Sequence, residues 1–389
     1  MNPKNDTWIG VLGGGQLGRM LALDARRMGF KVLKWTGGDV SGAANTADLV
    51  FEETFDDEQA FSKFIERVDV ATVEFENVPK ALLESVEERL PLMPQSSAIA
   101  TCQHREREKQ FLVNHKFPCA AFKTVASAEE LILAVRSFKT DAILKTAEFG
   151  YDGKGQQSIS HGSSREALSE HWTGFSNRKA VLEVKIDLAA EFSVLVVRGK
   201  NGEVATFDPA ENQHSNHILD VSIIPARLNP DQLKQAREIS IEIAKALDYV
   251  GVLAIEFFLS KDGRLLVNEL APRPHNSGHH TINACETSQF EQQLRAITGL
   301  PLGSTRLIRP AVMWNLLGDL WEDPHTAPDW NPILATPGAS LHLYGKSEAR
   351  PGRKMGHATF LADTTEEAMS RTNACRKYYG TDPTQSFIT

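Results

Sequence analysis

The stretch VNELAPRPHNSGHHT, residues 267–281, decides how this chain is interpreted. Two apolar runs, residues 251–259 and 265–267, lead into it. The pair Asp262-Gly263 lies between the runs, and Asp-Gly in that position is a strong signal for a two-residue hairpin turn. The sequence therefore predicts a β-hairpin whose second strand continues into the quoted stretch.

The register of this hairpin brings two carboxylates together. With a two-residue turn, Lys261 faces Arg264 and Glu256 stands directly opposite Glu269. Opposed side chains lie about 4.5–5.5 Å apart at Cβ, and like charges there destabilise a sheet. A divalent cation between the carboxylates would remove this cost, and Mg²⁺ with substrate phosphates is the usual occupant of such a site. A solvated pair at a sheet edge is the alternative, and a three-residue loop with a bulge would change the register.

The bulk properties restrict the classes of function. The chain has 389 residues, enough for two or three domains, and its 41% hydrophobic and 24% charged residues are typical of a soluble globular protein. A formal net charge of −8 argues against a general nucleic-acid binder. The N-terminus lacks an apolar signal core and no run reaches about 18 apolar residues, so we expect a cytoplasmic protein without a membrane span. The cysteines form no C-x-x-C pair, which predicts free thiols at Cys102, Cys119, Cys285 and Cys375.

The N-terminal part reads as a βαβ unit. Strands are predicted at residues 8–12 and 31–35, with a helical pattern between them, which indicates a parallel sheet. Gly13, Gly15 and Gly18 match the G-x-G-x-x-G dinucleotide fingerprint in its proper context. The second strand lacks the acid at its end that would hold a ribose, so a turn that binds another ligand, or a purely structural turn, competes with nicotinamide binding.

The central part of the chain, from about residue 142, is predicted to contain several strands and one glycine-rich loop. Strands are predicted at residues 142–145, 181–186 and 191–197, and a helix at 230–248. The loop at residues 149–156 carries three glycines and a lysine, a composition that lets backbone N–H groups approach phosphates. A mobile hairpin is the alternative, because no Lys-Ser/Thr pair opens a helix as in a Walker loop.

Two further groups of residues invite a ligand. Arg273, His275, His279 and His280 suggest a metal, but they lack a carboxylate or cysteine partner at zinc spacing, and the flanking prolines suit an arginine that holds an anion. A basic cluster could hold a phosphate monoester, with a solvated turn as the alternative. This cluster contains Lys346, Arg350, Arg353, Lys354 and His357.

Five ordered motifs together resemble one family. The chain resembles the ATP-grasp 5-(carboxyamino)imidazole ribonucleotide synthases of purine biosynthesis. The motifs that carry the resemblance are GGGQLGRM (13–20), EFENVP (74–79), GYDGKGQ (150–156), NELAPRPHNSGHHT (268–281) and RPGRKMGH (350–357). The related formate-dependent glycinamide ribonucleotide transformylases carry Asp-Thr-Gly after the histidine of Pro-Arg-Pro-His. This chain has Asn-Ser-Gly there, which favours the carboxylating family.

The resemblance implies a fold of mixed α/β and α+β class with ATP-grasp architecture. It implies a Rossmann-like pre-ATP-grasp domain at residues 1–108, an ATP-grasp domain with a lid at 109–303, and a small β-rich C-terminal domain at 304–389. It also implies ATP and Mg²⁺ as cofactors, bicarbonate and 5-aminoimidazole ribonucleotide as substrates, and a homodimer. Bicarbonate would attack the γ-phosphate to give carboxyphosphate, which then carboxylates the exocyclic amine.

The resemblance also implies a role for individual residues. ATP is expected at Arg105, Lys145, Gly150, Tyr151, Asp152, Gly153, Lys154, Gly155, Gln156, Glu183, Val184, Lys185, Ile186, Glu191, His214, Asn268 and Glu269. The ribonucleotide is expected at Gln16, Leu17, Glu76, Asp152, Lys154, Asn276, Lys346, Arg353 and Lys354. Mg²⁺ is expected at Glu256 and Glu269, and catalysis at Tyr151, Asp152, Arg273, His275 and Lys346. Many relatives carry arginine in place of Lys154, and lysine lacks the planar fork for a bidentate contact.

Two functions of other classes stay open at this point. A nicotinamide oxidoreductase would use the first glycine turn and bind NADH. A nucleotide sensor would bind ATP without turnover, but both carboxylates and the phosphate lysine are present.

Overall fold

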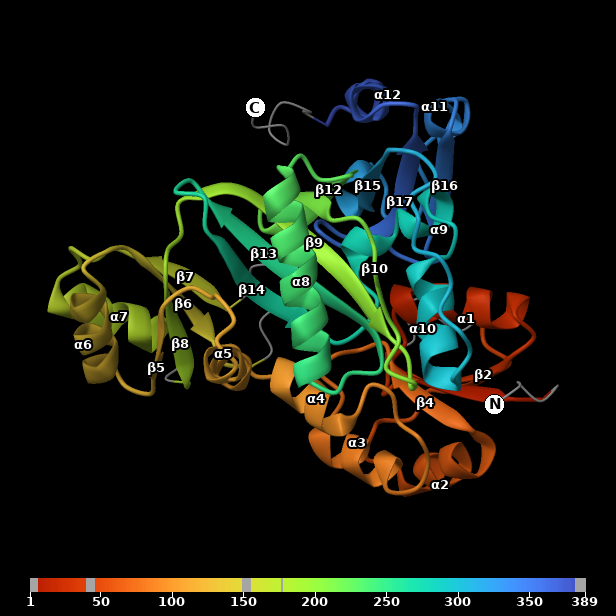
Figure 1. The fold of residues 1–389 in the computed structure, drawn as a ribbon, viewed down its shortest axis with the longest axis horizontal. Coiled ribbons are helices and arrows are strands. Elements are labelled where there is room, and N and C mark those ends of the chain that lie inside the picture. The colour runs from red at the N-terminus through yellow and green to blue at the C-terminus, as the bar shows by residue number, and fades with distance from the viewer. Residues whose placement is uncertain (1–5, 40–45, 149–154, 176–177, 382–389) are drawn as a thin grey trace.

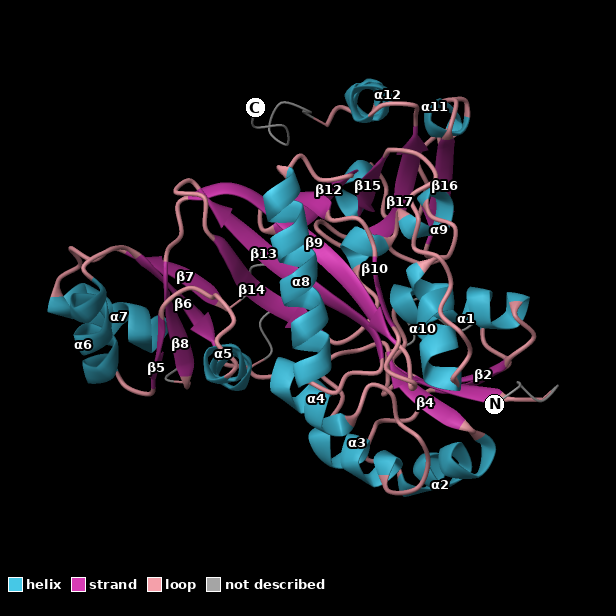
Figure 2. Ribbon diagram, viewed as in Figure 1, coloured by secondary structure: helices cyan, strands magenta, loops and turns pink. Residues whose placement is uncertain are grey.

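The computed structural model describes residues 6–39, 46–148, 155–175 and 178–381, and these form three β-sheets with helices packed around them (Figures 1 and 2). No helix in these ranges combines the length and the apolar composition that a membrane span requires. The four cysteines are free, as the sequence predicts.

The N-terminal sheet is parallel and has the strand order β3-β2-β1-β4. Its elements are β1 (Trp8–Leu12), α1 (Gln16–Arg27), β2 (Lys31–Trp35), β3 (Leu49–Phe51), α2 (Glu58–Arg67), β4 (Val70–Val73), α3 (Lys80–Glu87) and α4 (Ser96–Cys102). Apolar side chains of α1 pack on one face and those of α2 and α3 on the other. Strands β1 and β2 are parallel, which confirms the predicted βαβ start. Because β4 is also parallel to β1, the segments that follow the carboxyl ends of β1 and β4 lie at one edge of the sheet.

A small antiparallel sheet with the order β5-β8-β6-β7, here called the lid sheet, lies to one side of the molecule (Figure 1). Its elements are α5 (Arg105–Asn114), β5 (Phe122–Val125), α6 (Ala128–Phe138), β6 (Ala142–Thr146), β7 (Gln156–Ile159), α7 (Arg165–Gly174) and β8 (Ala180–Val184). Helices α6 and α7 bury its core through Leu131, Val135, Leu168 and Trp172.

The central sheet is larger and has the order β14-β13-β9-β11-β12-β15-β17-β16, with β10 added beside β9. Its strands are β9 (Leu188–Arg198), β10 (Val204–Thr206), β11 (Ala210–Ser215), β12 (Ile218–Ile224), β13 (Gly251–Ser260), β14 (Leu265–Ala271), β15 (Ala311–Leu317), β16 (Ala339–Leu343) and β17 (Lys354–Leu361). Its helices are α8 (Pro230–Ala246), η2 (Asn276–Gly278), α9 (Thr281–Ala284), α10 (Gln289–Thr298), η3 (Gly318–Leu320), α11 (Asn331–Leu334) and α12 (Thr365–Tyr378).

The predicted helix at 230–248 corresponds to α8, which begins with a capping box. The Asn229 side chain accepts the Gln232 N–H at 2.9 Å, and the Gln232 side chain accepts the Asn229 N–H at 3.1 Å. Pro230 occupies the first turn, where its missing N–H costs nothing. The apolar face of α8 packs on β9 and β13 and so holds the strands that carry the candidate site.

The predicted two-residue turn at Asp262-Gly263 is wrong. Ser260 pairs across the hairpin with Arg264: its N–H donates to the Arg264 carbonyl at 3.0 Å, and its hydroxyl accepts the Arg264 N–H at 3.0 Å. Three residues therefore form the loop, and Gly263 takes the left-handed conformation with φ of +86°. A glycine at this position is what a three-residue hairpin loop requires.

The predicted opposition of the two carboxylates is nevertheless confirmed, because a bulge compensates for the longer loop. Phe257 pairs with Val267, and the register then shifts so that Glu256 pairs with Glu269. Asn268 is the extra residue on β14. The bulge thus places Glu256 and Glu269 across from one another.

Candidate active site

Many of the predicted site residues meet in a cavity of about 360 Å³ bordered by the lid sheet and the central sheet. Those that line it are Glu76, Arg105, Lys145, Gly155, Gln156, Glu191, His214, Glu256, Asn268, Glu269, Arg273, His275, Asn276 and Lys354. The cavity is also lined by Ile143, Leu188, His217, Leu219, Phe258 and Ala271, which the sequence analysis did not single out. Phe258 lies two positions after Glu256, so strand alternation could have found it.

The opposed carboxylates of Glu256 and Glu269 lie among charged neighbours in the cavity. Burial, together with the neighbouring Glu269, raises the pKa of Glu256 to about 7. Arg105 Nη1 lies 3.2 Å from Glu269 Oε2, and His275 Nε2 lies 3.2 Å from Glu256 Oε1. No cluster of three or more His, Cys, Asp and Glu side chains in the described ranges could hold a metal by itself. Two carboxylates and substrate phosphates suffice for Mg²⁺, so the pair fits that ion.

Glu183 was predicted to line the nucleotide site, but its carboxylate forms ion pairs with two lysines. Its carboxylate is 2% exposed and lies 3.2 Å from both Lys109 Nζ and Lys145 Nζ. Burial opposes ionisation, but the two lysines outweigh it and lower the pKa of Glu183 to about 2. Lys109 Nζ also donates to the Asn268 carbonyl at 2.9 Å and so ties the lid sheet to the bulge of β14.

The residues after Glu183 do not line the cavity either. Val184 ends β8 and its N–H donates to the Ala121 carbonyl at 2.9 Å, while the Lys185 N–H donates to the Asp141 carbonyl at 2.9 Å. Ile186 is half-buried in the segment that leads to β9.

Two further contacts shape the opposite wall of the cavity. His214 Nδ1 lies 3.1 Å from Glu191 Oε2. Burial alone would lower the pKa of His214, but Glu191 outweighs it and the pKa is raised. Gln156 Nε2 lies 3.3 Å from His217 Nδ1, a contact that joins the start of β7 to the β11–β12 turn.

Arg273 connects the cavity to the edge of the N-terminal sheet. Its Nη2 and Nε lie 2.7 and 3.0 Å from Glu76 Oε2. Nearby, the Asn276 side chain is 7% exposed and neither its amide nitrogen nor its oxygen has a hydrogen-bond partner within the described residues. A buried amide of this kind in a cavity wall is typical of a group that binds a ligand.

The glycine turn before α1 wraps a carboxylate of the protein itself. Glu74 accepts the N–H of Gly15 at 2.9 Å and the N–H of Leu17 at 3.3 Å. A Cβ on Gly13 or Gly15 would stand 2.5 or 2.4 Å from the Glu74 oxygens, which explains these glycines. Because Glu74 occupies N–H groups that a pyrophosphate would need, the hypothesis of a nicotinamide dinucleotide at this turn loses its support.

Gln16 and the C-terminal lysines form a second group, beside the cavity. Lys346 Nζ donates to Gln16 Oε1 at 3.0 Å and to the Lys354 carbonyl at 2.7 Å. Burial, aided by Arg353, lowers the pKa of Lys346 to about 8. Arg353 Nη1 donates to the Glu348 carbonyl at 2.7 Å. Residues more than 300 positions apart thus converge, as the predicted ribonucleotide site requires.

The predicted basic cluster is smaller than expected, because His357 is buried elsewhere. Its ring lies 4.8 Å from that of His279 and 4.6 Å from that of His342, and its Nδ1 lies 2.9 Å from the Tyr344 hydroxyl. Burial lowers the pKa of His279 and His357 well below the usual range. Stacked neutral rings hold the C-terminal region against η2 and give no support to a zinc site.

Five predicted residues lie outside the part of the chain that the structure describes. They are Gly150, Tyr151, Asp152, Gly153 and Lys154.

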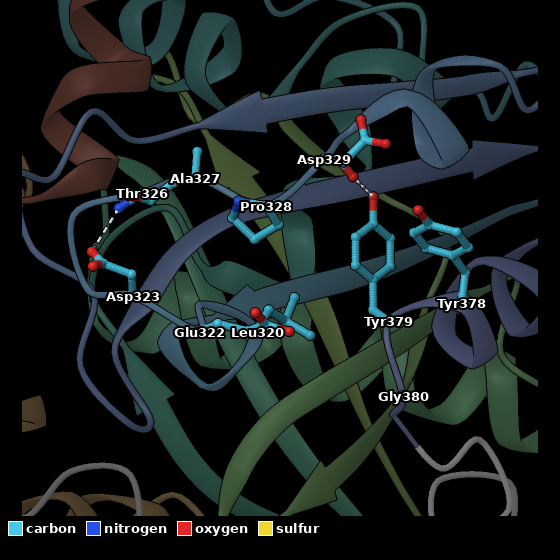
Figure 3. A pocket seen from close by; sticks show the side chains of 10 residues that line it. All are labelled: Leu320, Glu322, Asp323, Thr326, Ala327, Pro328, Asp329, Tyr378, Tyr379 and Gly380. Carbon is cyan, nitrogen blue, oxygen red and sulfur yellow. Dashed lines mark hydrogen bonds between the residues drawn. The ribbon is translucent and has the colours of Figure 1, made fainter.

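A second hollow, of about 680 Å³, lies in the C-terminal region (Figure 3). Acidic and aromatic residues dominate its lining, and the Tyr379 hydroxyl donates to the Asp329 carbonyl at 2.6 Å. Its lining is Leu320, Glu322, Asp323, Thr326, Ala327, Pro328, Asp329, Tyr378, Tyr379 and Gly380. The hollow contains none of the predicted site residues and no basic side chain for a phosphate.

The chain matches three family models in succession. A ribonucleotide synthetase pre-ATP-grasp domain matches residues 7–103, an ATP-grasp domain matches residues 110–290, and a phosphoribosylaminoimidazole carboxylase C-terminal domain matches residues 311–371.

Curated proteins and solved structures agree with these matches. The N5-carboxyaminoimidazole ribonucleotide synthase of Bacillus subtilis is 42% identical over 92% of this chain and 92% of its own length. The synthetase of Thermus thermophilus superposes with a TM-score of 0.87 at 40% identity, over 95% of this chain and 98% of that one. The Aspergillus clavatus enzyme, solved with ADP and 5-aminoimidazole ribonucleotide, gives a TM-score of 0.86 at 30% identity over 97% and 99% of the chains.

Proposed function

We propose roles for individual residues from one premise: the chain belongs to the N5-carboxyaminoimidazole ribonucleotide synthase family and carries out the ATP-dependent carboxylation of 5-aminoimidazole ribonucleotide in purine biosynthesis. The observation that supports the roles best is the cavity in which the opposed carboxylates meet two lysines and two arginines. These are the groups that phosphoryl transfer needs for positioning and charge neutralisation.

Arg105 and Lys145 bind the phosphates of ATP in this proposal. Both line the cavity, and Glu183 orients Lys145 from behind through their 3.2 Å ion pair. Glu256 and Glu269 would hold Mg²⁺, which would neutralise phosphate charge there. Burial and, after it, the facing carboxylate of Glu269 raise the pKa of Glu256, and a cation between the two carboxylates would oppose both effects.

The nucleoside part of ATP lies toward the other end of the cavity. Glu191 accepts ribose hydroxyls, and His214, 3.1 Å away, holds its carboxylate in place. Val184, Lys185 and Ile186 connect the lid sheet to the central sheet.

Arg273 and His275 act on bicarbonate. A bicarbonate oxygen attacks the γ-phosphorus as the bond to the β-phosphate oxygen breaks, which gives carboxyphosphate and ADP. The bond from the carboxyl carbon to the phosphate oxygen then breaks, the carbon forms a bond to the exocyclic amine of the ribonucleotide, and the departing phosphate takes up the proton that the amine loses. Arg273, fixed by Glu76, supplies a permanent positive charge for the carboxyl oxygens.

The ribonucleotide lies between the N-terminal sheet edge and the C-terminal lysines. Lys346, Arg353 and Lys354 bind its phosphate, while Gln16, Leu17, Glu76 and Asn276 contact the ribose and the base. The unpartnered amide of Asn276 supports this placement. The roles assigned to Tyr151 and Asp152 rest on sequence alone.

The test is ADP release by the purified protein with Mg-ATP and bicarbonate, with and without 5-aminoimidazole ribonucleotide. We expect release that depends on the ribonucleotide, with one ADP for each carboxylated product. ADP release that does not depend on 5-aminoimidazole ribonucleotide, but increases when glycinamide ribonucleotide and formate are added, would contradict the proposal and favour the transformylase.

We also propose, from the family resemblance alone, that the protein works as a homodimer in the cytoplasm. Sedimentation at micromolar concentration tests the assembly, and a monomer would refute it.

A further inference from the structure

A chain of buried polar side chains lies directly behind His275. Asn212 Nδ2 lies 3.0 Å from Ser193 Oγ, Ser193 Oγ lies 2.7 Å from Ser277 Oγ, and Ser277 Oγ lies 2.9 Å from His275 Nδ1. Asn212, Ser193 and Ser277 are 6%, 1% and 0% exposed. They come from β11, β9 and η2, and none of them lines the cavity. The roles proposed above assign no function to these three side chains.

The direction of these hydrogen bonds follows from the His275 end. The backbone N–H of Ser277 points at His275 Nδ1 at 3.4 Å, and an N–H can only donate, so Nδ1 must accept. The Ser277 hydroxyl therefore also donates its single proton to Nδ1. Its oxygen must then accept the Ser193 proton, and the Ser193 oxygen must accept from the Asn212 amide. The Ser222 hydroxyl, which donates to Asn212 Oδ1 at 2.9 Å, completes the same direction.

This direction determines which nitrogen of His275 carries the proton. An imidazole ring carries a proton on at least one of its two nitrogens. Because Nδ1 accepts, the proton is on Nε2, which lies 3.2 Å from Glu256 Oε1 at the cavity wall. His275 thus presents a donor to the cavity and has no lone pair there for a base.

We propose that Ser277, Ser193 and Asn212 are positioning residues that fix His275 as the Nε2–H tautomer, so that His275 donates a hydrogen bond to an oxygen of bicarbonate or carboxyphosphate. The direction of the chain rests on geometry alone, whereas the identity of the accepting oxygen rests on the function proposed above. Every donor in the chain points toward His275, so the bonds polarise one another in the same sense.

The tautomer is tested directly by ¹⁵N NMR of the full-length protein labelled at histidine, with His275 assigned by its loss in His275→Asn. We expect Nε2 of His275 to carry the proton and Nδ1 to resonate as an unprotonated acceptor, without any substrate present. A protonated Nδ1 would overturn the proposal whatever the protein's substrate is.

The catalytic consequence is tested by Ser277→Ala and Ser193→Ala. We expect Ser277→Ala to lower kcat about tenfold, which corresponds to about 1.4 kcal/mol, with the KM for ATP and for the ribonucleotide within about twofold of wild type. Ser193→Ala should lower kcat by a smaller factor, about threefold, because it acts only through Ser277. The double variant should match Ser277→Ala, because both changes act on the same bond.

Ser240→Ala is the matched control. Ser240 is also fully buried, and its hydroxyl makes one hydrogen bond, to the Ala236 carbonyl at 2.8 Å within α8. It should lose comparable stability with kcat unchanged. Equal kcat values for Ser277→Ala and Ser240→Ala would refute the positioning role. So would a double variant of Ser277 and Ser193 whose loss of kcat is the product of the two single losses, because the hydrogen-bonded side chains would then serve only stability. A wild type without ribonucleotide-dependent ADP release would refute the proposed function instead, and the NMR measurement would still decide the tautomer.

Discussion

Replacement of Lys109 by methionine would test how the buried charges behind the cavity are balanced. Lys109 is fully buried, and its ammonium lies 3.2 Å from Glu183 and 2.9 Å from the Asn268 carbonyl. Methionine keeps the length of the side chain but removes the charge. Glu183 would then keep only Lys145, which is one of the proposed ATP ligands.

The magnitude follows from the pKa of Glu183. The two lysines bring it from the ordinary value of 4.5 to about 2 despite burial, and each unit corresponds to about 1.4 kcal/mol, so the shift is equivalent to about 3 kcal/mol. Burial opposes this shift, so the attraction from Lys109, which lies at 3.2 Å and also hydrogen-bonds the carboxylate, amounts to at least about half of it. The lost bond to Asn268 adds about 1 kcal/mol, for a total of at least about 2.5 kcal/mol, near the lower end of what breaking a buried ion pair costs.

Urea unfolding at pH 7, followed by circular dichroism, measures this loss. The folded pKa of Glu183 is depressed, so its stabilisation is present above pH 4.5 and is lost as the pH falls toward 2. The stabilities of Lys109→Met and wild type should therefore converge in acid. The KM for ATP should rise at pH 7, because Lys145 alone must neutralise Glu183.

Two variants make the result decisive. Lys245→Met removes an exposed lysine 2.8 Å from Glu242 on α8 and should cost less than about 0.5 kcal/mol. Lys109→Met combined with Glu183→Gln removes both charges and should recover more than half of the lost stability. A Lys109→Met protein as stable as Lys245→Met, or a double variant less stable than the single one, would refute the reasoning.

Three further changes have distinct expected outcomes. Glu269→Gln should abolish ribonucleotide-dependent ADP release while circular dichroism stays that of wild type; near-normal turnover would remove the metal assignment. Arg353→Ala should raise the KM for the ribonucleotide about tenfold or more and leave the KM for ATP within about twofold, since a charged contact contributes about 1.5–3 kcal/mol; an unchanged ribonucleotide KM would exclude the phosphate contact. Gly15→Ala places a Cβ 2.4 Å from Glu74 and should lower the melting temperature by several degrees, whereas Gly162→Ala, where the nearest neighbour of a Cβ would be 3.9 Å away, provides a control at a glycine that also lies outside the left-handed region.

The local elements were readable from the sequence because their signals are local. Alternation and apolar runs located β1, β2 and β13, and the capping residues located the start of α8. The hairpin shows the limit of such reasoning. Its loop is one residue longer than predicted, and the bulge at Asn268, expected to change the register, instead restores the pairing of Glu256 with Glu269.

The contacts between distant segments were not readable from local patterns. Glu74 occupies the glycine turn from 59 positions away, and nothing near residue 74 distinguishes it from the neighbouring Glu76, which meets Arg273. Glu183 was assigned to the nucleotide, but two lysines from other elements bury it. Such pairings depend on how β-strands and helices cross in space, and a single sequence does not encode this in any short window.

The continuity of the central sheet affects whether the chain could be truncated between its predicted domains. Hydrogen bonds between β12 and β15 carry the sheet across the boundary expected at residue 303, from the carboxylates on β13 and β14 to Lys354 on β17 (Figure 1). A chain shortened at that boundary would expose the edge of β12, which is buried along Leu219–Ile224, and an apolar unpaired edge is a template for aggregation. The same continuity places Glu256, Glu269 and Lys354 on one hydrogen-bonded sheet. The lid sheet has its own strand pairing, so a shift of the lid sheet would leave the strand pairing of the central sheet intact.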